Sequence, residues 1–350
     1  MEIGKIILAI FFSFLFTYLF MPSLIKIADK RKLFVPKTYR RSHNKDISSL
    51  GGIAIFSGTL FSFFIFIDYV KFDDFKFLIS GVILLFLIGL RDDLHQLKSY
   101  LKLIGQTIVA LIVVVLGDIR ITSFYGLLGI YNINYTISII ITIILIIGII
   151  NSFNMIDGIN MLAAVLSLIF LLCFGLWFYL SGQFDLSLML FALSGSILAF
   201  LQYNGISPKI FMGDIGTNVI GLVMSVAIII FIELNSISKL TYHINAAPAV
   251  AFGMFCLPLT DMIRIVIIRI FRGKSPFTAD KNHLHHILLR KGFSHKKTTF
   301  LYALFSFILI SINFLLQYIE IQINLLMLVN FIIPGIFIYL VIKRKNQKNA

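Results

Sequence analysis

Residues 136–150 read TISIIITIILIIGII, and residues 151–160, which follow directly, read NSFNMIDGIN. The first stretch is apolar almost throughout and carries no charge. A membrane-spanning helix needs about 20 mostly apolar residues. The first stretch therefore predicts the body of a helix within a membrane, and the second places a group of polar side chains at one end of that helix.

Similar apolar stretches recur along the whole chain. It has 350 residues, of which 59% are apolar and 13% are charged, whereas a soluble domain carries about 25% charged residues. The same composition excludes a disordered chain. We expect an all-α, polytopic integral membrane protein with about 11 transmembrane helices, forming a single transmembrane domain over residues 1–350. The predicted spans are 3–24, 50–67, 75–90, 101–117, 136–150, 160–180, 186–203, 216–234, 246–268, 299–318 and 324–342.

The positive charges are distributed unevenly over the loops between these spans. All but five of the 30 Lys and Arg residues lie in or beside one set of alternate loops, which includes 25–49, 269–298 and the basic tail 343–350. The positive-inside rule makes this set cytoplasmic, with the N-terminus outside and the C-terminus in the cytoplasm. The net charge of +14 then reflects topology, and no nucleic-acid partner is expected.

Two further features bear on the fold. Residues 119–135 alternate between apolar and polar and contain two glycines, which predicts a small hairpin outside the membrane. Cys173 and Cys256 both lie in apolar runs, so they offer neither a disulfide framework nor the spacing of a metal site.

The polar residues at the ends of the spans form several groups, all on the predicted cytoplasmic side. Asp92 and Asp93 end the third span, and Lys98 and Lys102 follow on one helical face. Adjacent carboxylates repel each other, and a divalent cation or a phosphate-bearing ligand would explain this group better than an ion pair alone. Ordinary charge at a helix end is the alternative.

The second group consists of Asn151, Asn154, Asp157 and Asn160, which recur at every third position. On a helix they would form one polar stripe. Such a stripe between two apolar spans predicts an enclosed polar cavity. The alternative is that the amides only join neighbouring helices.

The third group surrounds Asp214, which lies between Gly213 and Gly216 just before a span. A hard cation such as Mg²⁺ prefers carboxylate oxygens together with substrate phosphates, which fits Asp214. A simple helix N-cap is the alternative.

The fourth group is His283, His285 and His286, in a basic loop. Zinc would need further ligands at a suitable spacing, so a loop that binds phosphate or sugar is favoured, and a solvated loop stays open. Weaker features are Arg41 and His43, which precede the glycine pair 51–52 at the expected start of the second span. We also expect Asp261 and Arg264 to form an ion pair within the ninth span.

In combination, these motifs resemble those of the polyprenyl-phosphate N-acetylhexosamine-1-phosphate transferases, in the WecA/TagO-like branch of glycosyltransferase family 4. The motifs are the paired Asp in 89–102, the stretch 151–160, Phe211-Met-Gly-Asp-Ile-Gly216 and the His-Leu-His-His loop. The related MraY-type enzymes resemble the chain less, because their loop motif before the second span and their histidine run differ.

The resemblance implies a Mg²⁺- or Mn²⁺-dependent enzyme of the bacterial inner (plasma) membrane with its active site on the cytoplasmic face. Such an enzyme transfers N-acetylhexosamine 1-phosphate, by default GlcNAc 1-phosphate, from a UDP-sugar to undecaprenyl or another polyprenyl phosphate. It releases UMP and starts a lipid-linked surface glycan such as O-antigen, teichoic acid or a related cell-wall polysaccharide. Members of the family are sometimes homodimers.

The resemblance also implies roles for individual residues of this chain. Asp214 would bind the metal with Asn154 beside it, Asp92 would deprotonate or orient the lipid phosphate, Asp93 would support this geometry, and Lys102 would hold a phosphate. Asn151, Asp157 and Asn160 would line the nucleotide side, and His283, His285 and His286 would contact the sugar phosphate. The chain departs from the family pattern at Asn160, where related members often have Asp, and at Met161, where many have Gly.

Three other functions are open to a membrane protein with acidic motifs. A phospho-N-acetylmuramoyl-pentapeptide transferase is the alternative within the same superfamily. A membrane transporter would place acids near the middle of the bilayer and show repeat symmetry. An aspartate-rich prenyltransferase would need two acidic motifs with helical spacing, and no acid follows Asp93 within nine residues.

Overall fold

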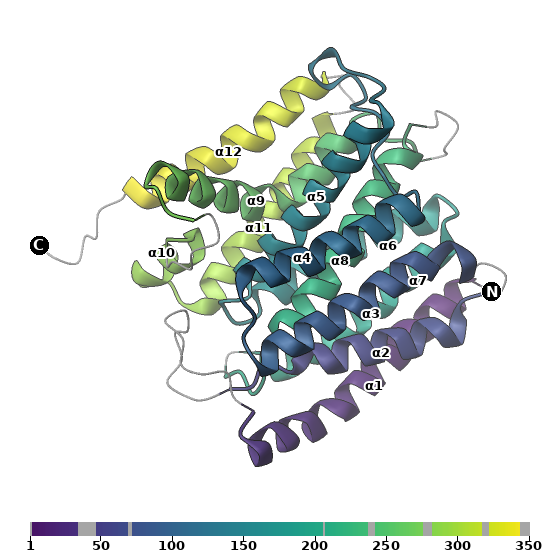
Figure 1. Ribbon diagram of the computed structural model, residues 1–350, viewed down its shortest axis with the longest axis vertical. Coiled ribbons are helices and arrows are strands. Elements are labelled where there is room, and N and C mark those ends of the chain that lie inside the picture. Colours follow the sequence, from purple (N-terminus) through teal and green to yellow (C-terminus); the bar gives the residue numbers. More distant parts are fainter. Residues whose placement is uncertain are drawn as a thin grey trace, which may run out of the picture.

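The computed structural model describes residues 2–33, 47–68, 72–205, 207–236, 242–275, 282–316 and 322–343. Over these ranges the chain folds into α-helices joined by short connections (Figure 1). The helices are α1 (Glu2–Arg31), α2 (Gly51–Phe66), α3 (Phe72–Leu94), α4 (Ser99–Leu111), α5 (Tyr135–Ile156), α6 (Leu162–Leu180), α7 (Phe184–Tyr203), α8 (Gly213–Leu234), α9 (Ala247–Phe271), α10 (Leu284–Arg290), α11 (His295–Leu316) and α12 (Ile323–Lys343). A π-helical turn, Ile112–Leu116, extends α4.

The predicted fold class is confirmed. Each of the eleven predicted spans corresponds to one long helix, and only the short α10 was not expected, because seven residues are too few to produce an apolar run. Within the described ranges, nine helices are long and apolar enough to cross a membrane. The other two long helices are α2, which has 16 residues, and α3, which carries charged residues at its end. The chain is a multi-pass membrane protein.

The start of α1 and the end of α12 lie at opposite ends of the helical bundle. Figure 1 shows α1 starting at the right of the bundle and α12 finishing at the left, on the same side as α10. An odd number of spans requires this arrangement.

Helix α8 forms the centre of the bundle. Some 94% of an 18-residue apolar stretch of this helix is buried, more than in any other candidate span of the described chain. The helix packs against α2, α3, α5, α6 and α9. Glycines permit the closest of these contacts. A Cβ atom on Gly52 would collide with the backbone of Gly216, and one on Gly89 would lie 2.6 Å from Ile215 Cα. The glycine pair 51–52, expected at the start of the second span, thus begins α2, and these close contacts bring α2 and α3 against the first turn of α8.

The predicted hairpin lies between α4 and α5. It contains one isolated antiparallel bridge, between Ser123 and Asn132, and Phe124 N–H donates to the carbonyl of Tyr131. Glu233, at the end of α8, fastens the hairpin: its carboxylate accepts from the backbone N–H of Thr122 at 2.8 Å, from the Thr122 hydroxyl at 2.7 Å and from the Tyr125 hydroxyl at 2.7 Å. A small hairpin is therefore present, as predicted, and its position outside the membrane stays a prediction.

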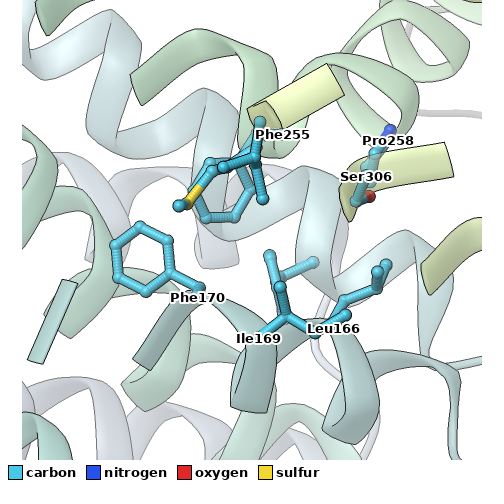
Figure 2. A pocket seen from close by; sticks show the side chains of 9 residues that line it. Leu166, Ile169, Phe170, Phe255, Pro258 and Ser306 are labelled. Atoms are coloured by element: carbon cyan, nitrogen blue, oxygen red, sulfur yellow. The ribbon is translucent and has the colours of Figure 1, made fainter. Parts of the chain in front are cut away.

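A small void lies inside the bundle between α6, α9 and α11. Figure 2 shows Phe170 and Leu166 of α6 on one side of it, with Phe255 of α9 and Ser306 of α11 opposite. Its volume is about 10 Å³, which is room for one water molecule. This part of the interior is too tightly packed for a substrate, and the polar groups gather instead at the helix ends.

Candidate active site

The first turn of α8 is held by two carboxylates from other parts of the chain. The N–H of Gly213 donates to Asp157 Oδ2 at 3.2 Å, and the N–H of Ile215 donates to Asp93 Oδ2 at 3.0 Å. The first N–H groups of a helix have no partner inside the helix, and the helix dipole favours negative charge there. The alternative that Asp214 itself is the N-cap is therefore wrong, because Asp93 and Asp157 satisfy these groups and leave the Asp214 side chain for other contacts.

Gly213 is required at the start of this turn. Its backbone has φ 72°, in the left-handed region, which residues with a Cβ rarely adopt. A Cβ atom at this position would also lie 2.5 Å from Asp93 Oδ2. The glycine thus allows Asp93 to reach the helix end.

Lys102, in the first turns of α4, lies between two carboxylates. Its Nζ is 2.5 Å from Asp214 Oδ2 and also contacts Asp92 Oδ2. The other oxygen of Asp92 accepts from the N–H of Leu97 at 2.7 Å, which closes the connection between α3 and α4. The expectation that Lys102 compensates the acidic pair is met in a modified form, because Lys102 joins Asp92 to the distant Asp214 and does not contact Asp93.

The three carboxylates Asp92, Asp93 and Asp214 carry more negative charge than their partners neutralise. Among the described residues, Lys102 is the one cation within salt-bridge distance of them. Carboxylate and amide oxygens are donors that a hard cation prefers. No three His, Cys, Asp or Glu side chains of the described chain are arranged to enclose a metal by themselves. The donors fit Mg²⁺ in the form it commonly takes, with one or two carboxylates from the protein and the remaining ligands from substrate phosphates.

The two asparagines of α5 have different surroundings. Asn154 donates to the hydroxyl of Thr217 at 3.3 Å, and its amide is near enough to the Asp214 carboxylate to interact with it. Asn151 donates to Gln106 Oε1 at 2.8 Å, and Gln106 is in turn 3.5 Å from Asn218 Oδ1. Asn154 therefore lies beside the expected metal ligand, whereas Asn151 joins α5 to α4, as the helix-packing alternative proposed.

The expected helical stripe through residue 160 is wrong. Helix α5 ends at Ile156, and residues 157–161 form a turn. Two backbone features explain the break: glycine at 158 is a poor helix former, and Met161 has φ 66°, which a right-handed helix cannot contain. Asp157 and Asn160 thus lie on a turn beneath the site, not on one helix face.

This turn is fastened from two other helices. The N–H of Met161 donates to Asn204 Oδ1 at 2.8 Å, just after α7. From α11, the Thr299 hydroxyl donates to the Asn160 carbonyl at 3.1 Å, and the N–H of Asn160 donates to His295 Nδ1 at 3.3 Å. The turn is consequently a fixed part of the site.

The three histidines lie on the other side of the same turn. A Cβ atom on Gly158 would be 3.3 Å from His285 Nε2 and 3.6 Å from His286 Cε1. His285 is 1% exposed, and burial lowers its pKa well below the usual value, with His286 and His283 lowering it further. His283 and His285 are both buried, so the solvated-loop alternative is wrong for them, and the described residues contain no zinc-like ligand set.

The contacts form one continuous series from α4 to α10. Lys102 contacts Asp92 and Asp214, the first turn of α8 contacts Asp93 and Asp157, and the residue after Asp157 lies against the histidines. The structure thus brings together the groups that the sequence singled out, except Asn151. The candidate features Arg41 and His43 and most of the tail 343–350 lie outside the described residues.

Several partners of these groups were not found from the sequence. They are Thr217, Gln106, Asn204, His295 and Thr299. Each lies on or directly after a helix that is far along the chain from its partner, and none stands in a recognisable spacing. The sequence offers no signal for such pairs until the packing of the helices is known.

Comparison with known proteins identifies the family. The model of "Glycosyl transferase family 4" matches residues 75–232. An undecaprenyl-phosphate alpha-N-acetylglucosaminyl 1-phosphate transferase of Haemophilus influenzae is 34% identical over 314 residues, which cover 88% of this chain and 86% of the relative. The chain belongs to glycosyl transferase family 4. A protein of the same description from Escherichia coli O157:H7 is 30% identical over 336 residues, covering 95% of this chain and 89% of the relative.

Membership of glycosyl transferase family 4 confirms the resemblance inferred from the motifs. The matched residues 75–232 run from α3 to α8. They include Asp92, Asp93, Lys102 and Asp214, whereas the histidines lie beyond them. The similarity to the two relatives extends over most of the chain.

Proposed function

We propose that this protein transfers N-acetylglucosamine 1-phosphate from UDP-GlcNAc to undecaprenyl phosphate and releases UMP. The names of the relatives support this donor and this acceptor. The observation that carries the proposal is the Lys102 ammonium between Asp92 and Asp214 at the first turn of α8. A cation between carboxylates at a helix N-terminus suits a reaction between phosphates, in which charge must be neutralised.

In the reaction, an oxygen of the lipid phosphate attacks the phosphorus that carries the sugar. The new P–O bond forms as the bond between that phosphorus and the UMP oxygen breaks, and UMP leaves. A phosphate monoester is already a competent nucleophile, so we favour direct attack over a covalent aspartyl intermediate. The protein then contributes mainly positioning and electrostatic stabilisation.

Each residue of the site has a part in this scheme. Lys102 donates to a phosphate oxygen, and Asp92, fixed by the N–H of Leu97, orients or deprotonates the lipid phosphate. Asp93 holds the first turn of α8 in place. Asp214, with Asn154 beside it, would hold Mg²⁺ or Mn²⁺, which supplies neutralisation of the diphosphate charge when bound.

The turn 157–161 and the histidines would bind the soluble substrate. Asp157 and Asn160 line the nucleotide side, and His283, His285 and His286 hydrogen-bond the sugar phosphate. The fixed backbone of the turn supports this role, because a rigid surface loses little entropy on binding.

The charge distribution supports the orientation. With the N-terminus outside, the site faces the cytoplasm of a bacterial inner membrane, and the cationic loops around it attract both anionic substrates. Residues 1–350 then form one transmembrane catalytic domain whose product starts a surface glycan. A homodimer stays a prediction.

A muramyl-pentapeptide transferase is the second candidate from the sequence. The names of the relatives favour N-acetylglucosamine as the donated sugar, and no feature of the described site favours a peptide-bearing donor.

The test is UMP release by the purified protein with undecaprenyl phosphate, Mg²⁺ and separate UDP-sugars. We expect UMP with UDP-GlcNAc, and only when both lipid and metal are present. UMP from UDP-N-acetylgalactosamine alone would change the donor. Release only from the muramyl-pentapeptide nucleotide would replace the proposal by the second candidate, and no release from any donor would contradict both.

A further inference from the structure

Asp261 is a buried acid of α9 whose contacts exceed those of the expected ion pair. Only 3% of it is exposed. Its Oδ1 accepts from Arg264 Nη2 at 2.7 Å, the pair expected from the sequence. Its Oδ2 accepts from His283 Nδ1 at 3.0 Å and from the N–H of Leu284 at 3.0 Å. Two of its contacts are thus with the segment that carries the histidines, not with its own helix.

Arg264 strengthens the same connection. Its Nη2 also donates to the carbonyl of Asn282 at 2.6 Å. The Asp261–Arg264 pair therefore binds three consecutive residues, 282–284, through two backbone groups and one imidazole. An ion pair that served only α9 would not need these contacts.

The contact fixes the orientation of the His283 ring. Because Nδ1 donates to a carboxylate, Nε2 is the nitrogen that remains for a ligand. The rings of His283 and His285 are almost parallel, with centroids 5.8 Å apart, and the centroids of His285 and His286 are 4.2 Å apart. The three rings therefore lie next to one another.

The histidine cluster faces the turn that bears Asp157. His285 packs against Gly158, and neither of its ring nitrogens has a hydrogen-bond partner among the described residues. A buried polar group without a partner is costly unless a ligand supplies one. The histidines thus stand between Asp261 on one side and the turn 157–161 on the other.

We propose that Asp261 is a positioning residue of the transferase reaction, which acts through His283 and α10 to hold the histidine cluster against the 157–161 turn so that it binds the sugar phosphate of the donor. The inference rests on the proposed function. Asp261 itself touches no substrate. Its effect is therefore confined to recognition of the UDP-sugar and does not extend to the lipid.

The first test is a double-mutant cycle on the full-length protein with Asp261→Asn and His283→Gln. We expect Asp261→Asn to lower kcat/KM for UDP-GlcNAc by about 100-fold and to leave KM for undecaprenyl phosphate within about twofold. In the double variant, kcat/KM for UDP-GlcNAc should be no more than about twofold below that of the less active single variant. Losses that multiply, or an equal rise in KM for the lipid, would overturn the inference.

The outer ion pair between Asp118 and Arg120, at 2.7 Å, provides the matched control. Asp118→Asn removes one carboxylate from an arginine pair far from the histidines, so both substrates should keep their kcat/KM. A donor-specific loss in Asp118→Asn as large as that in Asp261→Asn would contradict the proposed role.

Gly158→Ala approaches the same cluster from the other side. The backbone of Gly158 does not have a left-handed φ, so alanine can adopt the same conformation. The added methyl group, however, would crowd the His285 ring. We expect the same donor-specific loss with Asp261 intact. An unchanged KM for UDP-GlcNAc would count against the contact between turn and histidines.

Hydrogen exchange of residues 284–290 tests the tether without activity. We expect exchange in Asp261→Asn to be about tenfold faster than in the wild type and in Asp118→Asn. Unchanged exchange would overturn the inference. If the wild type releases no UMP with any donor, the proposed function fails, while this measurement still decides whether Asp261 holds α10.

Discussion

The two ends of α8 each carry one acidic side chain, but the partners of these acids differ. At the C-terminal end, the Glu233 carboxylate accepts from three neutral donors of the hairpin, from Thr122 and Tyr125. Burial and the Glu233 carboxylate raise the pKa of Tyr125, so the phenol stays a neutral donor. At the N-terminal end, Asp214 lies with Asp92 around one ammonium, and Asp93 is adjacent.

This difference indicates that Glu233 stabilises the fold, whereas Asp92, Asp93 and Asp214 form a ligand-binding site. Neutral donors make three short hydrogen bonds to Glu233, as in a structural hydrogen-bond network. The cluster at the N-terminal end keeps an excess of negative charge next to backbone groups that attract anions. Repulsion among carboxylates is tolerated where a cation or a substrate relieves it, and such sites tend to be functional.

The largest expected effect is at Asp214. Asp214→Asn keeps the shape of the side chain but removes the charge that would bind the metal, so UMP release should fall by about 1,000-fold or more. The thermal unfolding midpoint in detergent should stay close to that of the wild type. Near-normal turnover in this variant would show that the metal assignment is wrong.

Lys102 is expected to have the next largest effect. Lys102→Met leaves Asp92 and Asp214 without the cation between them and removes a phosphate donor, and kcat should fall by about 100-fold. Lys76→Met, near the N-terminal end of α3, removes a lysine that lies over the Phe77 ring and should leave kcat unchanged. Equal losses in the two variants would mean that Lys102 acts only through overall charge.

Glu233→Gln should have the opposite effects to Asp214→Asn, with lower stability and unchanged activity. The amide keeps one acceptor oxygen but turns a donor toward the hairpin, which should lower the free energy of unfolding by about 1–3 kcal/mol. Thermal unfolding in detergent measures this loss, and the rate of UMP release at a permissive temperature should be unchanged. A variant of normal stability that has lost its activity would remove the distinction between the two ends.

The smallest effect is expected at Met161. Its φ of 66° costs a residue with a Cβ about 1 kcal/mol, and glycine would remove this strain while adding entropy to the unfolded chain. Met161→Gly should therefore raise the free energy of unfolding by about 0.5 kcal/mol or less. A clear loss of stability would mean that side-chain packing of Met161 outweighs the strain.

The helices and most of the candidate active site could be predicted because the sequence patterns that indicate them are local. Each span is a continuous apolar run, and Asp92, Lys102 and Asp214 stand out as charges beside such runs. The division of labour among the acids could not be predicted. Asp93 accepts from the N–H of Ile215, which lies 122 residues later in the chain, and Thr122 is 111 residues from Glu233. A single sequence shows which residues are polar but not which helices meet.

The most direct test of the account is Mn²⁺ binding, followed by electron paramagnetic resonance, in the presence of UMP. The wild type and Glu233→Gln are compared with Asp214→Asn. We predict that the first two bind Mn²⁺ with equal affinity and that Asp214→Asn binds it at least about tenfold more weakly. If Asp214→Asn binds Mn²⁺ as tightly as the wild type, the excess charge at the N-terminal end of α8 is not a metal site, and the central claim is contradicted.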